Sequence, residues 1–245
     1  DGYKMWYAGD DGTNPYAVGL ATSPDGLTWT KHGGNPVLSP ENDWEANGIG
    51  GTSVISDSGL YKMWYTGVDS NWVYQIGYAT SPDGITWTRY GSNPVLTAGS
   101  SRSWDDEDVS YPTVLKVGSV YHMWYTGYDG MTARIGHATS TDGITWVKDS
   151  ANPVLDVGPA GGWDWLQVYG PQVVKVGSEY KLWYGGYTLP TASQPGYATS
   201  TDGSNWTRQA MLLPEGPGGS YDSRSADYPA VLVDGGGYKI WYSGL

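Results

Sequence analysis

Cysteine and phenylalanine are absent from this 245-residue chain, and charged residues make up only 16% of it. Without cysteine the chain has no disulfide framework, no thiolate metal site and no cysteine nucleophile. Basic residues are scarce, because 13 Lys and Arg stand against 25 Asp and Glu, for a formal net charge of −12. Such a chain repels the nucleic-acid backbone, and we expect no nucleic-acid partner. No apolar run approaches the roughly 20 residues of a spanning helix, so no membrane insertion is expected.

Glycine and two aromatic residue types are plentiful instead, with Gly 37, Trp 14 and Tyr 21. This composition is typical of a compact, turn-rich fold and excludes disorder as the main description. The length lies within the range of one large all-β domain, so we expect a single domain over residues 1–245.

A repeat of about 59 residues organises the chain. The motif YKMWYAG and its variants YKMWYTG, YHMWYTG, YKLWYGG and YKIWYSG recur at spacings of 58, 60, 59 and 58 residues. The first four copies are followed by an Ala-Thr-Ser segment, an Asp-Gly pair and a Trp. Internal repetition at this period indicates stacked or radial units. The units run approximately over residues 1–39, 40–97, 98–156, 157–213 and 214–245.

Each complete unit is predicted to hold four short strands, for example 110–117, 120–126, 134–140 and 145–148. Alternating apolar and polar positions with β-branched and aromatic residues favour strands, and the Asp-Gly pairs favour tight turns. Four-stranded sheets repeated radially are typical of a β-propeller. We therefore predict an all-β, five-bladed β-propeller of four-stranded antiparallel blades.

The terminal blades are predicted to be incomplete, since the sequence supplies 17 strands where five four-stranded blades need 20. Open strand edges invite pairing with another chain, so strand-mediated self-association is one expectation. The other is that residues beyond one or both termini complete the ring in a longer parent protein.

Residues that break the repeat are the candidates for function, because residues present in every unit serve the unit. The aspartates of the Asp-Gly pairs recur in the repeat, and so do the acids that directly follow a Trp or Tyr between the units. We assign both groups of acids a structural role. Trp72 and Trp165 stand outside the repeat. Aromatic faces can pack on the C–H faces of sugar rings, although packing within the loops is the alternative reading. The predicted substrate-binding residues are Trp72, Trp165, Tyr74, Tyr128, Tyr169, Tyr187 and Arg134.

Non-repeating acids provide the catalytic candidates. Cleavage of a glycosidic bond needs two carboxyl groups on either side of that bond. Inner strands of a propeller converge, so Asp108 and Asp227 are predicted to face one funnel, with Glu107 beside them. The acidic run that contains Asp108 can equally be a solvated linker or a set of Ca²⁺ ligands. Calcium is the one cofactor left open, because the three histidines show no metal-ligand spacing.

The units YKMWYTG, IGYATSPDGITW and NPVL resemble those of five-bladed propellers in the arabinanase, levansucrase and invertase superfamily, which includes glycoside hydrolase families 43, 32 and 130. In family 43, acids begin several inner strands, typically just before a proline. By that resemblance the matching positions are Gly50, Ser110, Tyr169 and Asp227, of which only Asp227 is acidic.

Two classes of function follow from these observations. The first is a glycoside hydrolase that acts on arabinan-, xylan- or fructan-type glycans through its carboxylates. The second is a non-catalytic propeller that binds carbohydrate or has a structural role. Such a propeller could be a natural fragment or an engineered scaffold. Carbohydrate is the expected partner in the first class and for a binding propeller, and a secreted or cell-surface location is the expected setting.

Overall fold

The computed structural model describes residues 2–189, 193–212, 216–217, 220–222 and 225–244. Seventeen strands cover most of these residues, as the sequence predicted, and helical structure among them is limited to one 3₁₀ turn, η1 (Asp43–Glu45). No helix in this part of the chain is long and apolar enough to span a bilayer.

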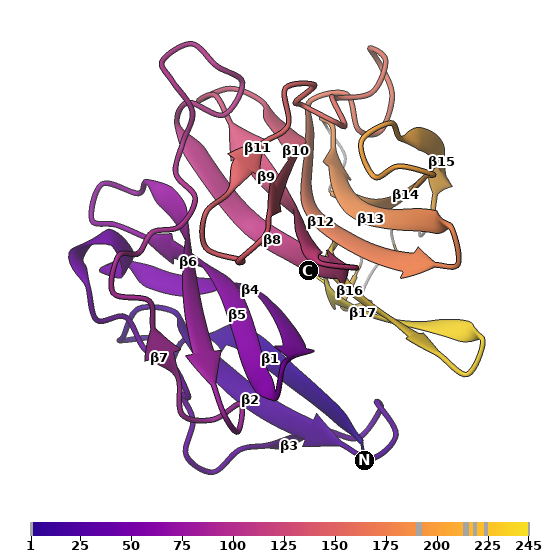
Figure 1. Cartoon of the computed structure of the whole chain (residues 1–245). Coiled ribbons are helices and arrows are strands. Elements are labelled where there is room, and N and C mark those ends of the chain that lie inside the picture. Colours follow the sequence, from indigo (N-terminus) through magenta and orange to yellow (C-terminus); the bar gives the residue numbers. More distant parts are fainter. Residues whose placement is uncertain (1, 190–192, 213–215, 218–219, 223–224, 245) are drawn as a thin grey trace. The chain divides into compact units, whose positions relative to one another are not determined.

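The strands form sheets in chain order, each antiparallel and built from neighbours in sequence (Figure 1). Blade 1 has three strands, blades 2, 3 and 4 have four each, and a two-stranded hairpin follows. The bounds are β1 (Tyr3–Gly9), β2 (Ala17–Ser23) and β3 (Thr30–Lys31) for blade 1; β4 (Gly48–Asp57), β5 (Leu60–Val68), β6 (Tyr74–Ser81) and β7 (Thr88–Arg89) for blade 2; β8 (Asp108–Val117), β9 (Val120–Tyr128), β10 (Ala133–Ser140) and β11 (Val147–Lys148) for blade 3; β12 (Gln167–Val176), β13 (Glu179–Tyr187), β14 (Gln194–Ser200) and β15 (Thr207–Met211) for blade 4; and β16 (Ala226–Asp234) and β17 (Gly237–Gly244) for the hairpin.

The predicted all-β propeller with four-stranded antiparallel blades is confirmed, whereas the predicted count of five blades is not. Among the described residues, four sheets have three or four strands, and the last sequence repeat contributes only the β16–β17 hairpin. The count differs because the prediction rested on five Trp-Tyr strands, and the last of them, β17, pairs only with β16 among the described residues.

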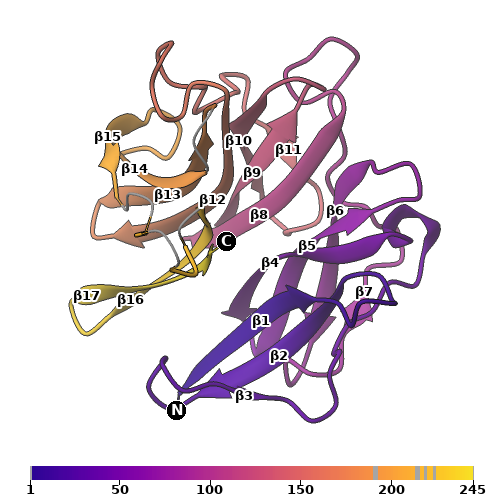
Figure 2. The ribbon, with the colours of Figure 1, turned by 180° about the vertical axis from the view of Figure 1, so that it is seen from behind.

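The chain divides into two compact units. The first contains the residues up to Ala98 together with Asp108–Val114, and the second contains Gly99–Glu107 and the residues from Leu115 onward. In the first unit β4 packs beside β1 and β2 (Figure 2). In the second unit β12 packs beside β9 and β10, and β16 packs beside β12. The expectation of one domain over the whole chain stays a prediction.

In blades 2 to 4 the Trp-Tyr motif fills the core, because its strand is covered on both faces. Trp64 and Tyr65 of β5 point to opposite faces of the sheet, and both are fully buried. The indole N–H groups also connect neighbouring blades: Trp6 Nε1 donates to the Gly84 carbonyl at 2.9 Å, and Trp124 Nε1 donates to the Gly203 carbonyl at 2.7 Å. Both carbonyls belong to Asp-Gly turns, so the two repeated motifs support each other.

The Asp-Gly turns are closed as the sequence predicted. Asp83 Oδ1 accepts the backbone N–H groups of Ile85 and Thr86, each at 2.8 Å, and the Ser81 hydroxyl at 2.9 Å. These donors lower the pKa of Asp83 to about 2. Gly84 has φ +80°, which glycine adopts without the steric cost of a side chain.

The Asn-Pro-Val-Leu motif is a β-like extension of blades 1, 2 and 3. The Asn35 side-chain amide accepts from Leu20 N at 2.8 Å and donates to Leu20 O at 3.0 Å, in the manner of a backbone ladder. Leu38 then forms a bridge with Val18. The sequence showed the repetition of this motif, but its hydrogen bonds appear only in the structure.

Blade 3 replaces a Lys–Tyr pair with two histidines. In blade 4 Lys181 Nζ donates to the Tyr197 hydroxyl at 2.9 Å. At the matching place His122 Nδ1 and His137 Nε2 lie 3.1 Å apart, and His137 Nδ1 lies 3.2 Å from Asp149 Oδ2. The spacing of the histidines along the chain gave no sign of this contact, whereas the pairing of β9 with β10 brings these two rings together. Burial lowers the pKa of both rings.

Candidate functional site

The inner strands share an irregularity near their beginnings. The register of β4, β12 and β16 against the next strand shifts after Gly50, Tyr169 and Asp227, respectively. The residue that follows each of these has positive φ, and Tyr228 does so at 49° without being glycine. Tyr111 of β8 has the same φ of 49°. Non-glycine residues in this region carry strain, and such strain concentrates at functional sites.

In the first unit, Asp108 and two tyrosines lie together. Asp108 Oδ1 accepts the backbone N–H of Tyr74 at 2.7 Å, which fixes the carboxylate at the start of β8. Tyr111 donates its backbone N–H to the Thr66 hydroxyl at 2.8 Å. Burial raises the pKa of Tyr74, and the nearby Tyr111 and Asp108 raise it further. The first unit therefore offers one carboxylate beside two aromatic rings.

Trp72 is held outward by the loop between β5 and β6. Asp69 Oδ1 accepts the N–H groups of Asn71 and Val73 at 2.8 and 2.9 Å, and Trp72 N donates to Asp69 O at 3.1 Å. The backbone of Trp72 has φ 66°, and 66% of the residue is exposed. The indole of Trp72 is therefore exposed at the surface, where it is accessible to a flat apolar ligand face.

In the second unit, Asp227 lies in a polar cluster with Tyr169 and Ser193. The Tyr169 hydroxyl donates to Asp227 Oδ1 at 2.8 Å, and it also hydrogen-bonds with the Ser193 hydroxyl. The rings of Tyr169 and Tyr228 lie 5.6 Å apart. Burial raises the pKa of Asp227, against the opposing effect of hydrogen bonds from Tyr169, Ser193 and Ser225. A carboxyl with a raised pKa can hold a proton at a pH where an exposed aspartate cannot.

The remaining predicted residues of the second unit have different surroundings. The Glu107 backbone N–H donates to the Tyr128 carbonyl at 3.0 Å, so the main chains of these two candidates meet. Arg134 is already paired, with Asp129 at 2.7 Å and Asp156 at 2.8 Å.

The last two predicted aromatics also belong to the second unit. The Tyr187 carbonyl accepts from Leu166 N at 3.1 Å, and 38% of Trp165 is exposed.

The structure thus brings Tyr74 to Asp108 and Tyr169 to Asp227. Asp108 belongs to the first unit and Asp227 to the second, and their convergence on one funnel stays a prediction. Sequence reasoning missed Tyr111, Tyr228 and Ser193 as neighbours of these carboxyls. The available signal was the Tyr-Pro pair, which stands at residues 111–112 and 228–229 where β12 has Gly-Pro.

Metal-binding side chains do not gather into a group of three or more in the described part of the chain. The acids of the run considered for calcium have separate partners. Asp105 pairs with Lys148 at 2.6 Å, and Asp106 accepts from Arg102 N. Asp108 accepts from the backbone N–H of Tyr74. Because these carboxylates serve different partners, the residues as placed do not form a Ca²⁺ site.

Comparisons with known proteins agree with this fold. Residues 69–157, which include Trp72, Tyr74 and Asp108, match the family of β-1,4-mannooligosaccharide phosphorylases, glycoside hydrolase family 130. The chain is 33% identical over 136 residues to the 1,2-β-oligomannan phosphorylase of Thermoanaerobacter sp., a match that covers 49% of this chain and 43% of that protein. It is 31% identical over 131 residues to the uncharacterized protein MT1551 of Mycobacterium tuberculosis, covering 51% and 42%.

The chain thus spans about two fifths of the length of these curated relatives. Among solved structures, a glycosyl hydrolase from Bacteroides ovatus superposes with a TM-score of 0.78 at 20% identity, over 98% of this chain and 77% of that one. At this identity the likeness shows the fold alone.

Proposed function

We propose that the chain is the propeller of an enzyme that cleaves β-mannosidic bonds, with Asp227 as proton donor and Asp108 as the second carboxyl group. The observation that carries the proposal is the environment of Asp227, which is a half-buried carboxyl that accepts from the Tyr169 hydroxyl at the bulged start of an inner strand and has a raised pKa. The mannoside substrate is favoured over the arabinan, xylan and fructan predicted from sequence, because the family match and a named relative are mannoside phosphorylases.

The chemistry needs a protonated acid beside the leaving oxygen and a second group on the other side of the bond. Asp227 would give its proton to the glycosidic oxygen as the bond to the anomeric carbon breaks. The Tyr169 hydroxyl, 2.8 Å from Asp227 Oδ1, would hold the resulting carboxylate in place. Asp108, oriented by the backbone N–H of Tyr74, would stabilise the developing positive charge on the sugar or position the nucleophile.

The nucleophile is water in a hydrolase and inorganic phosphate in a phosphorylase. The test therefore measures sugar release from β-1,2- and β-1,4-mannooligosaccharides with and without phosphate, beside arabinan, xylan and fructan. Sugar 1-phosphate that forms only with phosphate present would identify phosphorolysis. Release of the free sugar in both conditions would identify hydrolysis.

Variants of the two carboxyls decide their roles. Asp227→Asn and Asp108→Asn are each expected to lower kcat about 10²- to 10⁴-fold, the usual contribution of general acid–base catalysis. Asp106→Asn is the matched control, since Asp106 lies in the same linker as Asp108 and bonds only Arg102 N among the described residues. Full activity in Asp227→Asn, with the wild-type circular dichroism spectrum, would refute the assignment. If folded wild-type protein released no sugar from any substrate, the proposed enzymatic activity would be refuted.

Carbohydrate binding without cleavage is the second candidate, and the outward presentation of Trp72 favours it. Stacking of a sugar ring on an exposed tryptophan does not require either carboxyl. Trp72→Ala is expected to weaken mannooligosaccharide binding at least tenfold in isothermal titration calorimetry while the melting temperature stays unchanged. Leu27→Ala is a control, because 82% of Leu27 is exposed at a turn of the same unit. Equal affinity in both variants would remove Trp72 from the site.

The five-bladed ring and the secreted or cell-surface location also belong to this proposal. Five repeats of the Trp-Tyr strand support five blades, provided that further sequence completes the first and last units. The location is a prediction from the expected carbohydrate substrate, which the chain would meet outside the cell.

A further inference from the structure

A tryptophan and the acid that follows it occupy a receptor on blade 2. The Trp44 ring lies against Gly67 of β5, where a Cβ atom would overlap the ring. Glu45 is fully buried and accepts from the Tyr65 hydroxyl at 3.2 Å. Arg89 Nε on the outermost strand lies 2.9 Å from Glu45 Oε1. The receptor therefore consists of a glycine slot for the indole, a tyrosine hydroxyl and a basic side chain.

Blades 3 and 4 repeat this arrangement with the same chemistry. Asp105 lies 3.2 Å from the Tyr125 hydroxyl and 2.6 Å from Lys148 Nζ. In blade 4 Asp164 lies 3.1 Å from the Tyr184 hydroxyl and 3.0 Å from Arg208 Nε. The indoles again cover pairs of glycines. The members are Trp104, Asp105, Gly127, Gly136, Tyr125 and Lys148 in blade 3, and Trp163, Asp164, Gly186, Gly196, Tyr184 and Arg208 in blade 4.

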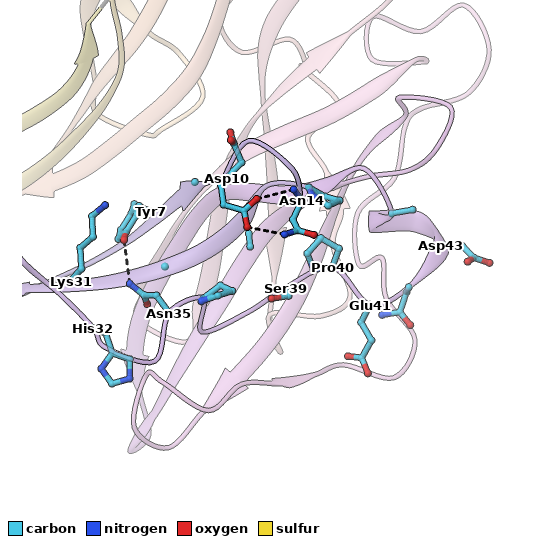
Figure 3. A pocket seen from close by; sticks show the side chains of 18 residues that line it. Tyr7, Asp10, Asn14, Lys31, His32, Asn35, Ser39, Pro40, Glu41 and Asp43 are labelled. Atoms are coloured by element: carbon cyan, nitrogen blue, oxygen red, sulfur yellow. Dashed lines mark hydrogen bonds between the residues drawn. The ribbon is translucent and has the colours of Figure 1, made fainter.

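Blade 1 carries the same receptor, and there it lines a pocket of about 840 Å³ (Figure 3). Tyr7, Gly9, Gly19 and Lys31 stand where the tyrosine, the two glycines and the basic residue stand in the other blades. The Tyr7 hydroxyl accepts from Asn35 Nδ2 at 3.2 Å. Among the described residues no carboxylate pairs with Lys31, whose Nζ lies 5.7 Å from the Tyr7 ring centroid.

The glycine slot differs from the filled ones in a measurable way. A Cβ on Gly9 would meet only the Tyr7 ring, at 3.7 and 3.9 Å, which is ordinary van der Waals contact. In the three filled receptors the equivalent Cβ would overlap an indole. The slot of blade 1 is therefore open to a ring of that size.

The sheet of blade 1 also has a strand edge that the other blades cover. Its order begins at β1, whereas in blade 2 the inner strand β4 pairs along β5. In blade 2 this inner strand begins three residues after Glu45, at Gly48. One continuous segment thus fills the receptor and covers the strand edge.

We propose that the blade 1 pocket is a docking site for a polypeptide segment in which Trp is followed by Asp or Glu and then by a strand that adds to β1. The indole takes the Gly9 and Gly19 slot, the carboxylate binds the Tyr7 hydroxyl and Lys31, and the strand pairs with β1. The occupant is a partner polypeptide of this chemistry, because the three filled receptors each hold the same combination of an indole, a carboxylate and a following strand. The inference stands apart from the proposed enzyme activity.

The test uses the chain's own filled segment as a probe. A fluorescently labelled synthetic peptide of residues 38–57 is titrated with the protein, and binding is followed by anisotropy. We expect saturable one-to-one binding that weakens at least tenfold when the peptide carries W44A or E45A. Binding that is absent, or that is equal for all three peptides, would overturn the proposal.

Variants of the pocket locate the binding site. Gly9→Val fills the slot and is expected to abolish binding, and Lys31→Met is expected to weaken it several-fold and to reduce its salt dependence. Gly33→Val is the matched control, since a Cβ at Gly33 meets nothing within 4 Å and Gly33 is outside the pocket. Undiminished binding to Gly9→Val would overturn the proposal.

Sedimentation tests the competing occupant. The proposal predicts a monomer without peptide. A dimer that dissociates in Gly9→Val would instead show a second copy of the chain in the pocket and would also overturn it.

Discussion

Substitution of Glu45 should show how much the filled receptor of blade 2 contributes to the free energy of unfolding. Its carboxylate is fully buried and has five donors or cationic atoms around it. Oε2 accepts from the Tyr65 hydroxyl at 3.2 Å, and Oε1 accepts from the backbone N–H groups of Glu41 at 2.9 Å and Asn42 at 3.2 Å and from the Asn42 side-chain amide at 3.1 Å. Arg89 Nε lies 2.9 Å from Oε1, as an ion pair outside the angular range of a hydrogen bond.

The Glu45→Ala variant removes the carboxylate acceptor of the buried Tyr65 hydroxyl and one of the two carboxylates of Arg89, whereas the exposed Glu41 and Asn42 can bond to water instead. Removing one partner of a buried ion pair costs about 3–5 kcal/mol, and each buried unsatisfied donor costs about 1–3 kcal/mol. Arg89 lowers the total, because its side chain is 15% exposed and keeps a second carboxylate, Glu41, at 2.8 Å. We therefore expect the free energy of unfolding to fall by about 3 kcal/mol, at the lower end of the ion-pair range.

Urea unfolding at pH 7, followed by tryptophan fluorescence, measures this difference. Glu41→Gln is the control, because the Glu41 side chain is 71% exposed and its pair with Arg89 should contribute less than about 1 kcal/mol. If Glu45→Ala and Glu41→Gln lost the same free energy, the buried carboxylate would have no special structural role, and the reasoning would be wrong.

Two further predictions concern pH and packing. Burial lowers the pKa of His122 and His137 below the unfolded value of about 6.5, so their contribution to stability is present above that pH and is lost as pH falls below it. In thermal melts from pH 8 to 4, the melting temperature of the H122K/H137Y double variant should therefore fall less than that of the wild type. An equal fall would contradict this reasoning. Gly67→Ala forces a methyl group into the Trp44 ring and should lower the free energy of unfolding by about 1–3 kcal/mol, whereas Gly9→Ala should change it by less than about 1 kcal/mol in the same urea assay; the reverse order would be incompatible with an open slot.

The fold could be predicted from sequence because its information is local and repeated. A 59-residue period, alternating apolar positions and Asp-Gly turns are all read along the chain, and each specifies a short-range structure. The strand count of 17 and the turn role of Asp83 followed from these signals. The number of complete blades did not, because the strand count alone does not show which sheet each terminal strand joins.

The candidate site was predicted only in part. The exceptions to the repeat pointed to Asp227 and Trp72, but a pattern of exceptions cannot tell which side chains meet. The contact of Tyr169 with Asp227 joins residues 58 positions apart. The contact of Tyr74 with Asp108 joins residues 34 positions apart, and it depends on a backbone N–H at the start of β6.

The sequence by itself determined the blade: its strands, its turns and the residues that recur in every copy. Only the tertiary structure decided what each recurring residue contacts, because the receptor for a tryptophan and its acid is assembled from three strands of a blade. For that reason the linker acids, which in the sequence are merely repeated carboxylates, become buried ion-pair partners in blades 2 to 4. The same receptor in blade 1 lines an open pocket, because there no described segment brings an indole and a carboxylate to it.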